Sequence, residues 1–419
     1  MNNLQEIIDK LQTDNNVFLT GGAGVGKTTL TKKIIQIFED DAKKVVKLAS
    51  TGMAATLING QTIHSFFDLG IAKDLLELEK NSKLELKKKI SKLIVTMDLI
   101  VIDEISMVSD TLFDMIIFRL NQAQYKGNLL VVGDFLQLPP VVKNSNDVKF
   151  AFEADSWKRS AFYTIELTHI YRTDDKTFIE LLNNIRFGKI DENIHNQLNS
   201  YIKPIPQDLS AFTFLFGKNS SSSIHNKKQL ENIDNELFIK EAQIIIHNRS
   251  IKKYEIDRFL VDTRIEKELH LKIDAPILFT RNSWNYFNGE RGRVINIDDN
   301  YLYIKKDNNK IVKLEQTIQN KTRWNEKLVD GKKEVIEEIL FTIYQFPIKL
   351  AFAITIHKSQ GMSIENLIIQ TNEIFAPSQF YVALSRSSNP QRLNLIAPKV
   401  QWYQLAFVNT KALEFVKIT

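Results

Sequence analysis

A short glycine-rich segment near the N-terminus constrains this chain more than any other feature. Residues 21–28 read GGAGVGKT and follow the apolar run VFLT at 17–20. They match the pattern G-x-x-x-x-G-K-[ST], between an expected strand and an expected helix that runs through Phe38. Glycines permit the tight turn that points backbone N–H groups at a phosphate, and the helix start adds its positive dipole end. The segment therefore predicts a phosphate site for a nucleotide.

Each position of this phosphate loop has an expected task. The ammonium group of Lys27 should reach the β- and γ-phosphates, and the Thr28 hydroxyl should bind Mg²⁺. ATP and Mg²⁺ are therefore the expected cofactors. The loop residues predicted to bind the nucleotide are Gly22, Ala23, Gly24, Val25, Gly26, Lys27, Thr28 and Thr29.

An acidic pair follows another apolar run, MDLIVIDEI at 97–105. Asp103 would lie at the carboxyl end of a buried strand, where ligands of open α/β sheets gather, and is expected to hold Mg²⁺ directly or through water. Glu104 is expected to orient and deprotonate the attacking water. A lone Asp-Glu pair is usually a solvated turn, but this one lies downstream of a phosphate loop. The two segments together predict Mg²⁺-dependent hydrolysis of a nucleoside triphosphate.

The stretch VVGDFLQLPP at 131–140 ends the next apolar run. In a sheet of this kind, the strand beside the Asp-Glu strand ends close to the γ-phosphate, so Gln137 is predicted to hydrogen-bond that phosphate or the water. Asp134 and the two prolines, whose φ angles are fixed, would transmit the presence or absence of the γ-phosphate to whatever lies outside the site. We interpret the stretch as a sensor; a plain strand end followed by a turn is the alternative.

The order of apolar and polar segments predicts an α/β fold. Continuous apolar strands at 45–50, 97–105 and 128–134 alternate with helical segments, which indicates a parallel sheet covered on both faces. The charged, helical stretch 72–95 is expected to be an excursion from that sheet. A second α/β pattern begins near Ile165. Its expected strands include 212–216 and 275–280, and short alternating strands from 293 to about 345 predict a small β insert.

The second half contributes two arginines and a short basic motif. Arg172 lies in LTHIYRTDD and Arg386 in YVALSRSS. An isolated arginine is usually a surface charge or part of a salt bridge. Arginines of a second α/β domain can instead stabilise charge on the transferred phosphoryl group, an effect of roughly 10³–10⁵ in rate. In ITIHKSQGMS, His357 and Lys358 are candidates for a phosphate backbone, and Gly361 permits close approach to the nucleotide; a surface His-Lys pair is the alternative.

Composition narrows the class of protein. The 419 residues include no cysteine, which excludes a disulfide scaffold and a thiolate metal site. No apolar run is long enough to cross a bilayer, and the first twenty residues resemble no secretory signal, so no membrane partner is expected. A formal net charge of +5 permits a polyanionic partner without demanding one.

In order along the chain, these motifs resemble those of superfamily 1B helicases, most closely the PIF (petite integration frequency) family, which is related to RecD and Dda. The resemblance covers nearly the whole chain. It rests on FLTGGAGVGKTTL, STGMAATLINGQTIHSFF, VIDEISMV, VVGDFLQLPPV, the long segment FAFEADSWKRSAFYTIELTHIYRTDDKTFIELLNNIRFG, AFAITIHKSQGMSIENLII and FYVALSRSS.

The resemblance implies two RecA-like P-loop NTPase domains with small 1B and 2B subdomains inserted. Domain 1A would span 1–164 and carry a 1B wedge at about 68–95. Domain 2A would comprise 165–292 and 344–419, with an SH3-like 2B insert at 293–343.

The implied activity is that of an ATP-dependent 5′→3′ DNA helicase. It would translocate on single-stranded DNA and unwind duplex or structured DNA, such as forks, G-quadruplexes or R-loops. The implied partners are single-stranded DNA and single-strand/duplex junctions, bound by a monomer in the cytoplasm or at the nucleoid. Stacking of bases on Phe66 and Trp284 would contribute about 1–3 kcal/mol per base, although an ordinary core position is an equal alternative for Phe66. The DNA contacts implied by the resemblance are Thr51, Gly52, His64, Phe66, Trp284, Thr355, His357 and Lys358.

One departure and two alternatives remain open from the sequence. Gln5 is near the distance at which the family reads adenine, but its usual flanking context is missing. The first alternative is a RecD-like motor subunit or a translocase that needs a partner to unwind DNA. The second, from another class, is a nucleotide-switched module that clamps nucleic acid without moving.

Overall fold

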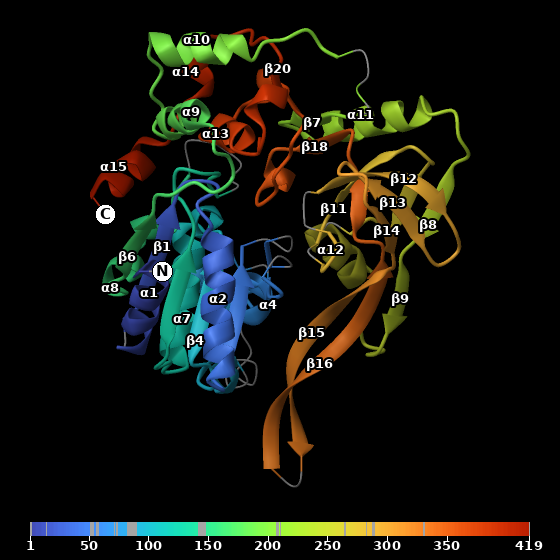
Figure 1. The fold of residues 1–419 in the computed structure, drawn as a ribbon. Helices are drawn as coiled ribbons and strands as arrows, with labels where there is room; N and C mark the ends of the chain where they lie inside the picture. The colour runs from blue at the N-terminus through green and yellow to red at the C-terminus, as the bar shows by residue number, and fades with distance from the viewer. Residues whose placement is uncertain are drawn as a thin grey trace. The chain divides into compact units, whose positions relative to one another are not determined.

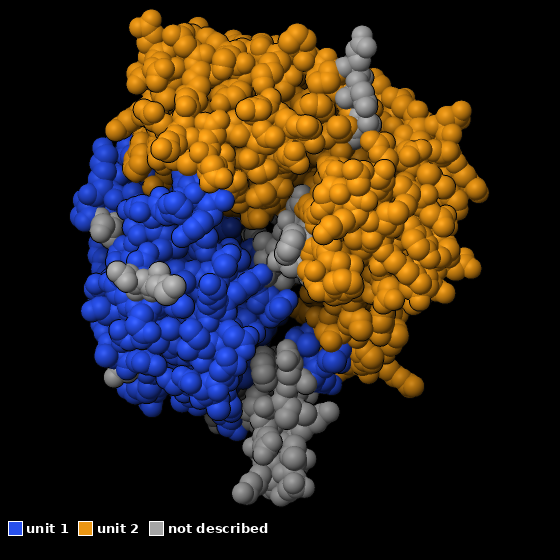
Figure 2. Space-filling view, viewed as in Figure 1, with its two compact units in different colours: residues 1–171, 322–339, 409–419 blue, residues 172–321, 340–408 orange. Residues whose placement is uncertain are grey.

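The structure is a computed structural model in which the chain divides into two compact units (Figures 1 and 2). Unit 1 comprises Met1–Tyr171, Thr322–Ile339 and Asn409–Thr419, and unit 2 comprises Arg172–Lys321 and Leu340–Val408. The structure describes residues 2–13, 15–50, 54–55, 58–70, 72, 74–81, 90–140, 148–206, 209, 211–263, 265–281, 283–286, 290–329 and 332–418.

Unit 1 is built on a six-stranded sheet in the order β3-β2-β4-β5-β1-β6, with every described pair parallel. The order places the phosphate-loop strand, the Asp-Glu strand and the strand before Gln137 in the middle of the sheet. Their carboxyl ends therefore meet at one edge, where the site is expected. The strands are β1 (Val17–Gly21), β2 (Val45–Ala49), β3 (Gln61–Thr62), β4 (Leu99–Asp103), β5 (Asn128–Val132) and β6 (Tyr163–Leu167).

Helices cover this sheet because their apolar faces repeat at helical spacing. One core cluster joins Ile7 and Leu11 of α1 with Ile34 and Phe38 of α2 against the central strands. The Ser109 side chain caps α7 by accepting a hydrogen bond from Leu112 N. The helices of unit 1 are α1 (Asn2–Gln12), α2 (Lys27–Asp40), α4 (Ile63–Phe66), α5 (Leu75–Asn81), α7 (Asp110–Gln122), α8 (Asp155–Arg159) and α15 (Thr410–Ile418), with the short 3₁₀ turns η1 (Ile105–Met107) and η3 (Ala151–Glu153).

A second part of the unit 1 core consists of packed aromatic rings, which we call the aromatic cluster. Its members come from β1, α7, the segment after β5, η3, α8 and α15. Ring centroids of neighbouring members lie between 4.3 and 6.3 Å apart. The cluster is formed by Phe18, Phe113, Phe135, Phe150, Phe152, Trp157, Phe162 and Phe415.

Unit 2 contains a four-stranded parallel sheet in the order β18-β7-β19-β20. Its strands are β7 (Thr213–Phe216), β18 (Ala353–Thr355), β19 (Leu367–Ile369) and β20 (Leu393–Leu395). Its helices are α9 (Lys176–Arg186), α10 (Glu192–Ser200), α11 (Asn219–Glu231), α13 (Gln379–Leu384) and α14 (Trp402–Leu405), with the 3₁₀ turns η4 (His357–Ser359), η5 (Thr371–Glu373) and η6 (Pro390–Arg392).

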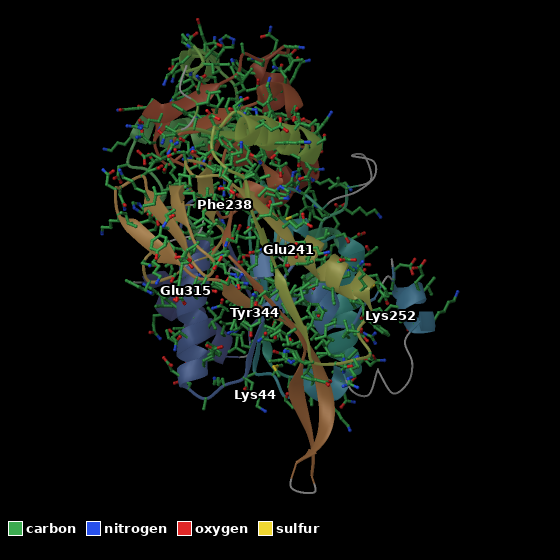
Figure 3. All side chains as sticks on the ribbon, turned by 90° about the vertical axis from the view of Figure 1, so that its right-hand side faces the viewer. Lys44, Phe238, Glu241, Lys252, Glu315 and Tyr344 are labelled. Atoms are coloured by element: carbon green, nitrogen blue, oxygen red, sulfur yellow. The ribbon has the colours of Figure 1, made fainter. Side chains whose placement is uncertain are left out.

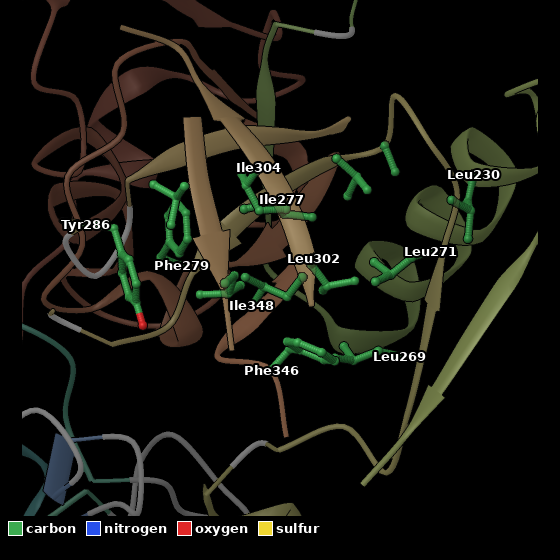
Figure 4. Packing of buried hydrophobic residues seen from close by; sticks show 14 of the residues in the cluster. Leu230, Leu269, Leu271, Ile277, Phe279, Tyr286, Leu302, Ile304, Phe346 and Ile348 are labelled. Atoms are coloured by element: carbon green, nitrogen blue, oxygen red, sulfur yellow. The ribbon is translucent and has the colours of Figure 1, made fainter. Parts of the chain in front are cut away.

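The rest of unit 2 is dominated by antiparallel strands. A five-stranded sheet in the order β14-β13-β12-β11-β17 encloses an apolar cluster that includes Ile277, Phe279, Leu302 and Ile304 (Figure 4). Figure 3 shows β15 (Thr317–Val329) and β16 (Lys332–Gln345) as a long two-stranded ribbon, of which Thr322–Ile339 belongs to unit 1. In the part that belongs to unit 2, β9 pairs with β16 from Phe341 to Tyr344. The other elements are β8 (Phe238–Glu241), β9 (Gln243–Ile246), α12 (Lys253–Thr263), β10 (Glu268–Leu271), β11 (Pro276–Phe279), β12 (Arg291–Ile297), β13 (Leu302–Lys306), β14 (Ile311–Leu314) and β17 (Ile348–Leu350).

Two elements differ from their sequence-based placement. The second α/β pattern was expected to start near Ile165, but β6 pairs in parallel with β1 and belongs to the first sheet. The run 275–280 was expected in the second parallel sheet, but β11 pairs antiparallel with β12 and β17. A four-residue run that is buried throughout reads the same in either kind of sheet, so periodicity cannot separate them.

Within the expected excursion at 72–95, the structure describes helix at residues 75–81 and 90–94. Helix α5 opens the stretch, and Leu78, Leu93 and Ile94 bury their side chains. Residues 82–89 lie outside the described residues. Among the helices of the described ranges, none combines the length and apolar character needed to cross a bilayer.

Candidate nucleotide and nucleic-acid sites

The phosphate loop connects the end of β1 to the start of α2. Gly24 and Gly26 have φ angles of 81° and 87°, in the left-handed region that L side chains rarely adopt. The Lys27 ammonium donates to Gly21 O at 2.6 Å and to Gly22 O at 2.8 Å. The loop is therefore arched around its own lysine, with the first turn of α2 opening toward the same space.

Asp103 supplies a buried carboxylate at the neighbouring strand end. Its Oδ1 accepts a hydrogen bond from Glu104 N at 2.8 Å. Burial raises the pKa of Asp103, and the Glu104 N–H and the charges of Lys27 and Lys32 oppose that rise. The charge of Lys27 in the phosphate loop thus acts on the carboxylate of Asp103, so the two motifs lie close together. A carboxylate, a hydroxyl at Thr28 and a phosphate are the oxygen ligands that Mg²⁺ takes, so the donor set fits this ion.

The residues directly after Glu104 pack against a glycine at the end of β5. Glu104 has left-handed backbone angles, φ 53° and ψ 48°, and η1 starts immediately after it. A Cβ at Gly133 would lie 2.9 Å from Ile105 Cγ2 and 3.0 Å from Ile105 N, and Gly133 N donates to Leu19 O at 3.1 Å. Glycine at 133 therefore permits the close approach of the Asp-Glu turn to the segment carrying Gln137.

Gln137 is held in a tight turn with Asp134. Gln137 N donates to Asp134 O at 2.8 Å, and Leu136 N donates to Asp134 Oδ1 at 3.1 Å. The Gln137 amide lies 3.4 Å from Asp134 Oδ2. All ten residues from 131 to 140 are buried, so the stretch is not an ordinary surface turn. Its role as a sensor remains a prediction.

Tyr171 is a candidate site residue that the sequence reasoning missed. Its N–H donates to Gly24 O at 2.9 Å, and its ring carbons lie 3.6 and 3.7 Å from where a Cβ at Gly26 would be. The side chain is 72% exposed although it touches the phosphate loop. An exposed aromatic ring there can stack on a planar group. The only sequence signal was a tyrosine directly before Arg172.

The two predicted arginines meet on one serine of unit 2. Arg172 Nη1 donates to Ser385 O at 2.5 Å and Nε donates to Ser363 Oγ at 2.9 Å. Arg386 Nη2 donates to Ser385 Oγ at 2.9 Å, and its Nε donates to Val382 O at 3.0 Å. Arg386 is 2% exposed, which rejects the surface-charge alternative for it. Two arginines 214 positions apart are thus joined through Ser385.

The basic motif of the second half lines a pocket of about 610 Å³ in unit 2. Thr355, His357 and Lys358 contribute to one wall, and Lys358 N lies 3.4 Å from Thr355 Oγ1. Gly217 and Asn219, from the end of β7 and the start of α11, contribute to another part of the lining. The structure therefore brings the three predicted contacts of the second domain together.

The remaining predicted contacts have mixed outcomes. Phe66 is 2% exposed and packs edge-on against Phe67 at 4.9 Å, which supports the core alternative and removes its ring as a platform for a base. Trp284 is 92% exposed. His64 is half-buried on α4. Thr51 and Gly52 lie outside the described residues.

Two further positions complete the comparison with the sequence. Gly361 is exposed with φ 75°, a conformation that favours glycine. The Gln5 amide donates to Asp9 Oδ1 at 2.7 Å within α1, on the surface of that helix. Among the described residues, no group of three or more His, Cys, Asp or Glu side chains is arranged to hold a metal ion.

A parallel sheet with a phosphate loop after β1, and with an Asp-Glu pair and a buried glutamine at neighbouring strand ends, defines a P-loop NTPase. A family model described as PIF1-like helicase matches residues 2–196. ATP-dependent DNA helicase Pif1 of Campylobacter jejuni is 38% identical over 431 residues, covering 98% of this chain and 96% of that protein. The chain belongs to the PIF1-like helicase family and is an ATP-dependent DNA helicase.

Solved structures agree. Pif1 from Bacteroides sp in complex with ADP-AlF4 superimposes with a TM-score of 0.82 at 28% identity, covering 99% of this chain and 96% of that one. Bacteroides Pif1 bound to single-stranded DNA has a TM-score of 0.67, covering 99% and 95%. The predicted class of two RecA-like domains is thereby confirmed.

Proposed function

We propose that this helicase moves 5′→3′ on single-stranded DNA and separates duplex ahead of it, driven by ATP hydrolysis at the phosphate loop of unit 1. The observation that carries the hydrolysis step is the convergence of Lys27, Asp103, Glu104 and Gln137 at neighbouring strand ends of one sheet, and the direction is taken from the family resemblance. These groups supply phosphate binding, metal binding, a base and an amide, which ATP hydrolysis requires.

The residues divide the chemistry between them. Lys27 and the loop N–H groups bind the β- and γ-phosphates, and Thr28 and Asp103 would hold Mg²⁺. When bound, the ion neutralises charge on the phosphates. Glu104 accepts a proton from the attacking water, and the Gln137 amide orients that water. Tyr171 offers its exposed ring to the adenine, in place of a role for Gln5.

Arg172 and Arg386 of unit 2 are the arginines that we propose for the hydrolysis step. Both guanidinium groups are fastened to Ser385, so they would approach the γ-phosphate as a pair. Their positive charge stabilises the transferred phosphoryl group. Because the arginines and the phosphate loop lie in different units, we expect ATP hydrolysis to be coupled to motion of the units. Gly361 would approach the same phosphates through its backbone.

Single-stranded DNA is the proposed ligand of the unit 2 pocket. Solved Bacteroides Pif1 structures bound to single-stranded DNA support this assignment. Lys358 and His357 would contact phosphates, and Thr355 would donate a hydroxyl. His64, Thr51 and Gly52 would continue the path in unit 1, and exposed Trp284 would stack on a base at about 1–3 kcal/mol.

The proposal also covers the subdomains of the chain and its oligomeric state. Residues 68–95 would act as the 1B wedge at single-strand/duplex junctions. The predicted β insert at 293–343, widened to include β11 and β17 of the same sheet, would be the SH3-like 2B subdomain. Each chain carries both the phosphate loop and the arginine pair, so a monomer has every group that the reaction needs. Action at forks, G-quadruplexes or R-loops, in the cytoplasm and at the nucleoid, fits this reading.

Strand separation on tailed duplexes tests the function. One duplex carries a 5′ single-stranded tail and its matched partner a 3′ tail, both with ATP and Mg²⁺. We expect unwinding of the 5′-tailed duplex alone. Unwinding of only the 3′-tailed duplex would refute the direction. Hydrolysis without unwinding of either would favour the translocase or RecD-like motor subunit that needs a partner.

Replacing Gln137 with alanine is expected to retain nucleotide binding but lose most of the stimulation of ATPase activity by single-stranded DNA. The amide that links the γ-phosphate to the Asp134 turn is missing in this variant. The measurement is the ratio of steady-state ATPase rates with and without DNA. Gln36→Ala, on the exposed face of α2, serves as the matched control. Normal stimulation in Gln137→Ala would refute the sensor role.

A further inference from the structure

The C-terminal helix α15 packs on the aromatic cluster that lies beneath the sensor turn. The Phe415 ring is stacked on Phe152, with centroids 4.3 Å apart and planes at 11°. It also meets Phe135 edge-on at 5.3 Å and lies 6.3 Å from Phe18. One late residue thus contacts both the strand that leads into the phosphate loop and the segment that carries Gln137.

Phe135 transmits its position to Gln137 through the turn they share. Its ring is 1% exposed and contacts Phe18, Phe152 and Phe415 in the aromatic cluster. The residue lies between Asp134 and Leu136, whose N–H is bound to the Asp134 carboxylate. Since the ring and the turn belong to the same short segment, a shift of the ring displaces the Gln137 backbone.

Polar contacts fasten α15 to the same region. Asn409 Oδ1 caps the helix by accepting from Lys411 N at 3.0 Å and Ala412 N at 3.3 Å. Lys411 Nζ is paired with the Glu153 carboxylate, whose other oxygen accepts from Phe150 N at 3.0 Å. Ala412 is fully buried. The helix is therefore docked at its start, along one face and at Phe415.

The chain immediately before α15 is fastened to unit 2. Phe407 O accepts a hydrogen bond from Ser378 N at 2.9 Å, directly before α13, the helix that leads to Arg386. A Cβ at Gly188 would lie 3.2 Å from Val408 Cγ2, so this stretch is closely packed. Only Val408 separates Phe407, held on unit 2, from the Asn409 cap in unit 1. Phe407 and Asn409, each bound within its own unit, are therefore only two positions apart in the chain.

We propose that α15 is a positioning element that mechanically links the arginine-bearing part of unit 2 to the sensor turn, with Phe415 setting the position of Phe135. The inference rests on the proposed sensor role of Gln137. Motion of the α13 region would be transmitted to α15 through the short connection at Val408. The Phe415 ring of α15 packs on Phe135, which precedes Gln137 in the sensor turn. Phe415 acts through Phe135 and touches no substrate.

The first test compares Phe415→Ala with Phe415→Leu and with Lys417→Ala, an exposed position on the same helix. We expect Phe415→Ala to lower DNA-stimulated kcat about tenfold, while the DNA-free ATPase rate and the KM for ATP stay within about twofold of wild type. Phe415→Leu should recover part of the stimulation, and Lys417→Ala should match wild type. Unchanged stimulation in Phe415→Ala, or an equal fall with and without DNA, would overturn the proposal.

Comparison with Gln137→Ala separates the two claims. If Gln137→Ala keeps full stimulation, the sensor assignment fails, whatever Phe415→Ala does. If Gln137→Ala loses stimulation and Phe415→Ala does not, the sensor stands and the positioning role fails. Loss of stimulation in both, with no further loss in the double variant, is the expected result.

A second test asks whether α15 stays docked during the cycle. The chain has no cysteine, so Lys411→Cys with Glu153→Cys introduces a unique pair for a short bismaleimide. Because the helix is proposed to remain attached, the cross-linked protein should keep the ATPase stimulation of the same variant without cross-linker. Loss of stimulation only after cross-linking would show that α15 must detach, which contradicts a fixed positioning element.

Discussion

Replacing Lys27 with alanine is expected to abolish ATP hydrolysis and to leave single-strand binding largely intact. The ammonium group lies at the centre of the phosphate loop, 2.6 Å from Gly21 O, and no other loop residue can place a cation there. The contacts proposed for DNA come from other elements, so their affinity should change little. Steady-state ATPase rates and fluorescence anisotropy with a labelled oligonucleotide measure the two properties.

Lys33 supplies the control for that experiment. It lies on the same helix, α2, with its side chain exposed. Lys33→Ala should hydrolyse ATP at the wild-type rate, which separates the specific effect of Lys27 from a general effect of losing one positive charge. Appreciable turnover in Lys27→Ala would show that the nucleotide site has been assigned to the wrong loop.

Arg172→Ala is expected to lower kcat for ATP by roughly 10³, with little change in nucleotide affinity. The guanidinium charge matters most when negative charge moves on the phosphoryl group, so its loss acts on the transition state. Arg172→Lys should recover little, because one ammonium cannot reproduce the fork that holds both Ser385 and Ser363. Single-turnover hydrolysis and nucleotide-binding measurements separate the two effects.

The matched control is Arg392→Ala, an arginine of unit 2 bound to Asn366 and outside the proposed site. Burial lowers the pKa of Arg172 and Tyr381 opposes that shift. The guanidinium group nevertheless stays charged at every working pH, so the contrast between Arg172→Ala and Arg392→Ala does not depend on the pH of the assay. Near-wild-type kcat in Arg172→Ala would remove it from the catalytic machinery.

Local patterns predicted the strands and turns that carry the motifs of unit 1, because each motif is a continuous segment whose structure depends on its own residues. The local sequence is enough to recognise a phosphate loop, a buried strand that ends in Asp103 and a turn that ends in two prolines. Contacts between distant segments are not. Nothing in the sequence joins Arg172 to Arg386, since Ser385 does so only after the second sheet forms.

Short apolar segments were the other place where the structure differs from the sequence-based prediction. Phe66 and β11 are apolar residues whose neighbours in sequence do not reveal which layer they join. Helix α4 directs Phe66 into the core beside Phe67, and β11 packs into an antiparallel sheet around Phe279. Tyr171 was missed for the opposite reason, because only contact with Gly26 distinguishes it from any exposed tyrosine.

The late position of Phe415 also bears on biosynthesis. Every other ring of the aromatic cluster precedes residue 163, so the first unit emerges from the ribosome with one face of Phe135 and Phe152 uncovered. Phe415 follows ~250 residues later, an interval of roughly 10–50 s at usual synthesis rates. Unit 1 thus completes its packing only after unit 2 has been made. The faces of Phe135 and Phe152 that Phe415 covers in the finished protein would therefore stay uncovered throughout that interval.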